Sequence, residues 1–238
     1  MIGQLLATDL LKMRRTGIWW IVFIGPAGLA AMQALNFGLR YDYLVLDQYK
    51  SDPWAGLLSS VGSFVPIAIY LAMTLLMSMI ASIENRQNSW KQTLALPVKR
   101  SQVFASKFLC CLVQLLAACV LLSVSIVIVG LALRLPGEIP YFDLLTLGFY
   151  PLLASLPLLG FMLWAALTLR NQAIPISLGI AASLVSVFGG SLSEAIPLSW
   201  PSLVVAGQET FLFMGLGVAL FAVLYLLGSI HFSRKDVA

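Results

Sequence analysis

Apolar residues fill six long runs of this chain, and polar stretches separate them. A helix needs roughly 20 apolar residues to cross a hydrocarbon core of about 30 Å. No water is available there to satisfy a bare backbone, so repeated runs of this length predict a bundle of membrane-spanning helices. We expect an all-α integral membrane protein whose six-span bundle occupies residues 17–231. The expected spans are 17–37, 57–82, 108–133, 144–169, 174–190 and 211–231.

The residues before the first run predict a separate helix. Apolar residues recur there at helical spacing, namely Ile2, Leu5, Leu6, Leu10 and Met13. The polar residues lie mostly elsewhere around the helical wheel, namely Gln4, Thr8, Asp9, Lys12 and Arg15. We expect residues 1–16 to form an interfacial elbow helix, with Lys12, Arg14 and Arg15 near anionic headgroups. The alternative is a slightly longer first span with ordinary flanking charges.

Composition agrees with a membrane location, since the chain of 238 residues is 60% hydrophobic and 10% charged and has a mean hydropathy of +0.95. Of its 14 Lys and Arg residues, 11 fall on the side that holds both termini. Short cytoplasmic loops retain basic residues, so both termini are expected in the cytoplasm and the chain in the plasma membrane. The net charge of +4 then reflects a cytoplasmic leaflet and not nucleic-acid binding.

Residues that would support catalysis are missing from the sequence. There is no glycine-rich phosphate loop, so any ATP hydrolysis needs a partner subunit, and the lone His231 offers neither a metal pair nor a triad. The span centres contain essentially no acid or base, which disfavours an intramembrane enzyme and proton-coupled transport. An uncharged interior is compatible with an amphiphilic cargo.

The most polar segment is "IENRQNSWKQTLALPVKRSQVFASKF", residues 83–108, which separates the second and third runs. Ser89 and Gln92 have the spacing of a capping box, and Pro97 would stop the short helix that follows Ser89. A second helix is expected to begin near Ser101 and continue into the third span. The basic residues could simply enforce topology and contact lipid, or the segment could dock a cytoplasmic protein.

The spacing of residues in this segment resembles that of a known family. Glu84, Trp90-Lys91, Leu96-Pro97, Arg100 and Lys107 follow the pattern Glu–(5)–Trp-Lys–(4)–Leu-Pro–(2)–Arg–(6)–Lys. This pattern is similar to that of permease subunits of type-two ABC exporters, especially the lantibiotic-immunity and bacitracin-resistance group. The opening "LLKMRRTGIWWIVFIGP" also resembles the start of that group.

The resemblance implies a single permease domain over residues 1–238, with the elbow helix at 1–16 and a cytoplasmic coupling loop at 83–107. It implies a cytoplasmic ATPase dimer that binds ATP and Mg²⁺, a second permease chain that is identical or homologous, and no cofactor in this chain. The cargo would be an antimicrobial peptide or another amphiphile. The expected ATPase-coupling residues are Glu84, Arg86, Trp90, Lys91, Leu94, Pro97, Arg100 and Lys107. The rival interpretation is a non-transporting membrane sensor or scaffold that docks a cytoplasmic partner through the same loop.

Overall fold

The computed structural model describes residues 2–14, 16–86, 99–169 and 171–234. These residues form helices and connecting turns, and the described part of the chain contains no strand. In chain order the elements are α1 (Ile2–Arg14), α2 (Ile18–Leu39), the π-helix η1 (Asp42–Gln48), α3 (Pro53–Gly62), α4 (Val65–Arg86), α6 (Arg100–Ala132), α7 (Tyr141–Thr168), α8 (Ala173–Ser186), the 3₁₀ turn η2 (Gly189–Ser191), α9 (Trp200–Val205) and α10 (Thr210–Arg234).

Five of the described helices, α2, α4, α6, α7 and α10, are long and apolar enough to cross a membrane. The expected span at 174–190 instead forms α8, an apolar helix of 14 residues. At a rise of 1.5 Å per residue α8 is about 21 Å long, which is shorter than a hydrocarbon core. The chain turns at Gly189, whose missing side chain leaves room for the Ser202 side chain of α9. Six full spans are therefore not confirmed, and the described residues provide five and a shorter sixth helix.

The second expected span, 57–82, is divided between two helices. Asp52 caps α3, because its Oδ1 accepts a hydrogen bond of 3.0 Å from the backbone N–H of Ala55, and Pro53 occupies the first turn. α3 ends at Gly62, and α4 begins three residues later at Val65. Apolar residues continue on both sides of this break, which is why the sequence indicates one run where the chain forms two helices.

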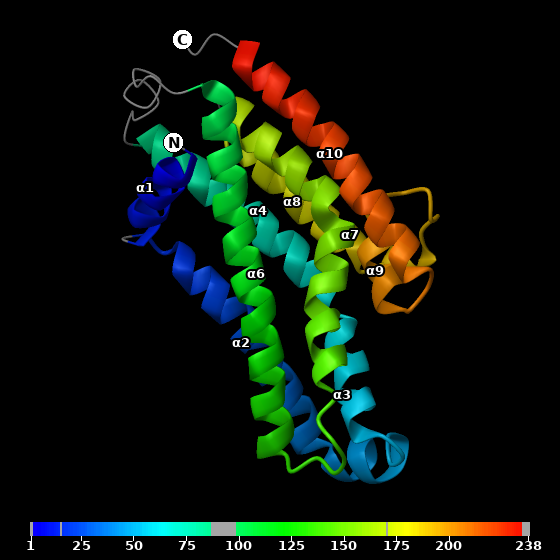
Figure 1. Cartoon of the computed structure of the whole chain (residues 1–238). Coiled ribbons are helices and arrows are strands. Elements are labelled where there is room, and N and C mark those ends of the chain that lie inside the picture. The colour runs from blue at the N-terminus through cyan, green and yellow to red at the C-terminus, as the bar shows by residue number, and fades with distance from the viewer. Residues whose placement is uncertain (1, 15, 87–98, 170, 235–238) are drawn as a thin grey trace.

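The spanning helices pack as neighbouring layers (Figure 1). α2 packs against α6, α4 packs against α7 and α8, and α7 forms its most extensive contacts with α10. α7 and α10 approach each other closely at Gly217, where an added Cβ would lie 2.8 Å from Cα of Ala154 and 2.6 Å from the carbonyl oxygen of Leu153. Only a residue without a side chain fits this backbone-to-backbone approach.

Figure 1 places α1, the end of α4, the beginning of α6 and the end of α10 at one end of the bundle. α3 and the connection between α6 and α7 lie at the other end. The described ends of the chain, at the start of α1 and the end of α10, therefore lie at the same end of the bundle. The charge distribution predicts that this side is cytoplasmic.

Candidate functional site

Two helices flank the predicted coupling segment, and their ends fix where that segment is attached. Glu84 and Arg86 lie in the last turn of α4, and Arg100 is the first residue of α6. Lys107 lies two turns further along α6. The other predicted coupling residues, Trp90, Lys91, Leu94 and Pro97, lie outside the described residues.

The beginning of α6 is defined by a local hydrogen bond. The backbone N–H of Lys99 donates to Oε1 of Gln102 over 3.3 Å, and the backbone N–H of Gln102 donates to the carbonyl oxygen of Lys99 over 2.9 Å. This arrangement satisfies a free donor at the helix start. The helix expected to begin near Ser101 and to continue into the third span is confirmed, with its first residue at Arg100.

A buried ion pair joins α6 to α1. Nζ of Lys107 lies 2.6 Å from Oδ1 of Asp9, and the hydroxyl group of Ser106 donates a hydrogen bond of 2.7 Å to Oδ2 of the same carboxylate. The side chains of Lys107 and Asp9 are only 4% and 9% exposed. Both carboxylate oxygens therefore have partners, which is the condition under which a buried charge is tolerated.

The structure corrects the expected orientation of α1. Asp9 was expected to lie away from the apolar side of the helix, yet it is buried, as is Met13. Asp9 follows Leu5 by four residues and precedes Met13 by four, so these three side chains share one face. That spacing is the sequence signal that could have identified Asp9, but its partners Ser106 and Lys107 lie nearly one hundred positions away.

The same contact between α1 and α6 continues toward the membrane interior. Nε2 of Gln114, a fully buried side chain, donates to Sδ of Met13 over 3.1 Å. Oε1 of Gln114 has no hydrogen-bond partner among the described residues. α1 is thus attached to α6 by a line of polar contacts that spans about two helical turns.

The structure places two of the three basic residues that were expected on the elbow helix. Lys12 is half-buried on α1, Arg14 is the last residue of that helix, and Arg15 lies outside the described residues. Thr16 ends the turn after α1, because its hydroxyl group donates a hydrogen bond of 2.8 Å to the carbonyl oxygen of Met13. α1 is therefore a helix separate from α2, and its location in the headgroup layer stays a prediction.

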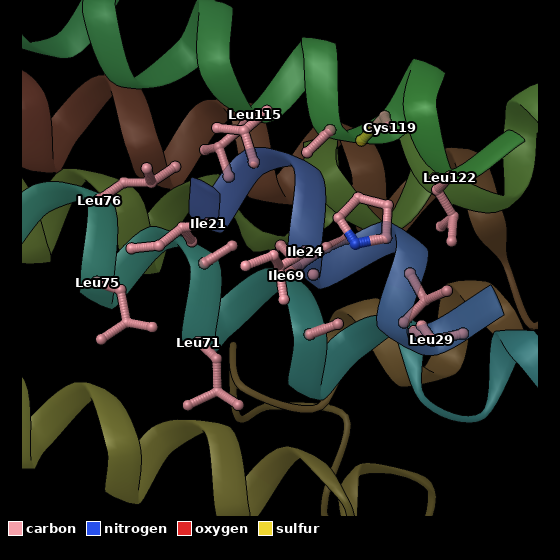
Figure 2. A pocket seen from close by; sticks show the side chains of 18 of the residues that line it. Ile21, Ile24, Leu29, Ile69, Leu71, Leu75, Leu76, Leu115, Cys119 and Leu122 are labelled. Carbon is pink, nitrogen blue, oxygen red and sulfur yellow. The ribbon is translucent and has the colours of Figure 1, made fainter. Parts of the chain in front are cut away.

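An apolar pocket of about 440 Å³ lies between α2, α4, α6 and α7. Figure 2 shows its lining side chains grouped where α2 passes between α4 and α6, among them Ile21, Ile24, Leu76, Leu115 and Cys119. No lining side chain carries a charge, a hydroxyl group or an amide. The chemistry of this pocket is restricted to hydrocarbon contacts.

A second pocket of about 520 Å³ lies on the side of α3 and the beginning of α7. Its lining includes the carboxylates of Asp52 and Asp143 and the hydroxyl groups of Thr146 and Tyr150. Residues of α9 and α10 complete its wall. Unlike the apolar pocket, this one presents negative charge.

Within the described residues no group of three or more His, Cys, Asp and Glu side chains could hold a metal ion. Cys110, Cys111 and Cys119 are free and buried within α6. The imidazole of His231 lies edge-on to the Trp164 ring, with a centroid separation of 6.0 Å and an interplanar angle of 82°. This contact joins α10 to α7 and gives His231 a packing role.

Comparison with known proteins connects these elements to one family description. Residues 5–186, which include most of α1, all of α2 to α8 and more than half of the chain, match a family model described as "ABC-2 family transporter protein". No curated protein matches the chain significantly.

Proposed function

Because the chain belongs to the ABC-2 family of transporter proteins, we propose that it is the permease subunit of an ATP-driven exporter that moves an amphiphile out of the membrane. The family supports a multi-pass membrane component that works with a separate ATP-binding subunit. The more specific parts of the proposal are export, the identity of the cargo and the residues that contact the ATPase.

The observation that carries the proposal is the direct continuity of α4 and α6 with the segment at 87–98. α6 has 33 residues and is therefore about 50 Å long, whereas the hydrocarbon core is about 30 Å thick. Several turns of α6 must extend beyond the hydrocarbon, and Lys99, its N-cap residue, and Arg100, its first residue, stand at its beginning. A force applied to the segment at 87–98 would be transmitted along this rigid helix into the bundle.

The ion pair between Asp9 and Lys107 extends this connection to a third helix. Since Lys107 lies two turns into α6, a displacement of the beginning of α6 also moves α1. In the proposed mechanism, closure of two ATP-binding subunits pushes on the coupling segment, and α1, α4 and α6 move together. A second permease chain, identical or homologous, would complete the pathway.

Binding between this chain and its ATPase tests the proposed coupling. The full chain is co-expressed with its proposed ATP-binding subunit, and Leu94→Asp places a carboxylate on the predicted apolar side of the coupling helix. We expect at least a tenfold loss of co-purified ATPase. Leu46→Asp is the matched control, because Leu46 is an exposed leucine of η1 at the opposite end of the bundle. Equal ATPase recovery from both variants would contradict the proposed docking site.

The cargo that the structure supports best is a cationic amphiphile, for example an antimicrobial peptide of the lantibiotic or bacitracin type. The pocket lined by Asp52 and Asp143 offers two carboxylates, and the interiors of the spans are apolar. Cells that express the chain with its ATPase are compared against a panel of such peptides, beside cells whose ATPase lacks its phosphate-loop lysine. Unchanged sensitivity to every peptide would overturn this cargo assignment.

A non-transporting sensor or scaffold remains the second candidate, because it would also need a cytoplasmic docking segment. The two candidates differ in whether added cargo changes the rate of ATP hydrolysis. A permease in proteoliposomes changes the ATP hydrolysis rate of its ATPase when cargo is added, and a scaffold leaves that rate unchanged.

A further inference from the structure

We propose that the apolar pocket between α2, α4, α6 and α7 binds one acyl chain of a phospholipid from the predicted cytoplasmic leaflet. This inference concerns a ligand site within one copy of the chain. It does not depend on the proposed function, the cargo or the ATPase.

The pocket exists because small residues line it where larger side chains would fill the space. Gly25 of α2, Ala68 and Ala72 of α4, and Ala118 of α6 belong to its wall. A Cβ added at Gly25 would meet no atom within 4 Å. The resulting volume of about 440 Å³ falls within the range of about 300–1,000 Å³ that small-molecule pockets occupy.

The lining chemistry excludes water as a stable occupant. A buried water needs two to four polar partners, and here the side chains that contain any heteroatom are the indole of Trp20 and the thiol of Cys119. An empty volume of this size would also forfeit the dispersion contacts of its lining atoms. A hydrocarbon chain restores these contacts without burying a polar group.

Several lining side chains of the pocket are exposed on helices that are long and apolar enough to span a membrane. Trp20 is 69% exposed and Ile24 is 61% exposed, and both belong to the spanning helix α2. Leu75 of the spanning helix α4 is also exposed. In a membrane these side chains meet lipid, so an acyl chain can enter sideways between α2 and α4 without crossing an aqueous phase.

The depth of the pocket matches one leaflet. Trp20 lies near the beginning of α2, the position where tryptophan side chains favour the membrane interface. The α2 residues that line the pocket continue to Leu29, and nine residues of helix rise about 14 Å. Half of a 30 Å hydrocarbon core is about 15 Å, so the pocket extends from the headgroup level to near the midplane.

Photo-crosslinking in nanodiscs tests the proposal. The full chain is reconstituted with phosphatidylglycerol whose acyl chain bears a diazirine, and the crosslinked peptides are mapped by mass spectrometry. We expect crosslinks concentrated on the pocket-lining parts of α2, α4 and α6. Ala72→Phe and Ala118→Phe fill the pocket and are expected to lower these crosslinks at least fivefold.

Ala219→Phe is the matched control, because Ala219 is an exposed residue of α10 and does not line the pocket. It is expected to leave the α2 crosslinks unchanged. Crosslinks spread evenly over the exposed faces of α2 and α10, or unaffected by both filling variants, would overturn the proposal. So would a disulfide between two copies that each bear Ile24→Cys, because a second copy would then cover the mouth.

Thermal unfolding provides a second test of the proposal if the phenylalanine variants do not fold. Gly25→Leu adds a smaller side chain that points into open space. In delipidated detergent, phosphatidylglycerol is expected to raise the Tm of the unaltered chain by several degrees and that of Gly25→Leu by less than half as much. An equal increase in both would contradict an acyl chain inside the pocket.

Discussion

The ammonium nitrogen of Lys107 lies 2.6 Å from Oδ1 of Asp9, and this pair joins the first described helix of the chain to the third long helix of the bundle. The contact makes α1 part of the packed structure instead of an appended segment. The basic residues near the coupling segment therefore differ in their exposure. Lys107 is buried and paired, whereas Lys99 is exposed.

The first prediction concerns this ion pair. Asp9→Asn or Lys107→Met leaves one buried charge without its counterion, and such a loss typically costs about 3–5 kcal/mol. The double variant removes both charges and is expected to be more stable than either single variant. Thermal unfolding in detergent measures the three variants, with Lys99→Met as an exposed control expected to behave like the unaltered chain. A double variant with the summed loss of both singles would contradict the pairing.

A second prediction compares two glycines of α10. Gly217→Ala places a methyl group against the backbone of Leu153 and Ala154, so we expect a loss of about 1–3 kcal/mol. Gly215→Ala, two residues away, meets no atom within 4 Å and is expected to stabilise the helix by about 0.5–1 kcal/mol. Chemical denaturation of both variants checks whether the signs differ, and equal effects would contradict the close packing of α7 and α10.

A third prediction tests the orientation in the membrane. The native cysteines are buried, so a membrane-impermeant maleimide should give little background. Lys99→Cys and Asp47→Cys introduce exposed thiols near opposite ends of the bundle. In intact cells we expect Asp47→Cys to be labelled and Lys99→Cys to be labelled only after permeabilisation. The reverse result would invert the topology.

A fourth prediction addresses the acidic pocket. Asp143→Asn removes a carboxylate from its lining and is expected to weaken protection against cationic peptides several-fold at low salt. The difference should shrink at high ionic strength, because an exposed charge is screened over about 10 Å at 0.1 M salt. Glu138→Gln is the control, since Glu138 is an exposed acid at the same end that does not line the pocket. Growth assays across a salt series would detect the effect, and equal sensitivity of both variants would remove this pocket from the cargo pathway.

Hydropathy predicts the spanning helices well because membrane insertion depends on local sequence. Four of the six expected spans correspond closely to α2, α6, α7 and α10, and the remaining two differ at glycines. Gly62 is the last residue of α3 and Gly189 lies three residues beyond the end of α8, but neither lowers hydropathy enough to mark a boundary. Their effect depends on neighbours distant in sequence, such as Val205 near Gly62 and Ser202 near Gly189.

The candidate site is also harder to predict from the sequence, because its residues come together from distant parts of the chain. Lys107 was identified through the family resemblance, yet nothing near it in sequence indicates that its partner is Asp9. The apolar pocket is also invisible in the sequence, because alanines and glycines on three helices create it jointly. The start of α6, in contrast, was predicted near Ser101 and lies at Arg100.

The distance in sequence between Asp9 and Lys107 also orders events during synthesis. Asp9 leaves the ribosome 98 positions before its counterion, a delay of about 5–20 s at translation rates of about 5–20 residues per second. During that interval α1 cannot bury its carboxylate, so it must wait in a hydrated environment while α2 and α4 insert. Docking of α1 onto α6 therefore cannot precede synthesis of the third long helix, although α1 is translated before α2 and α4.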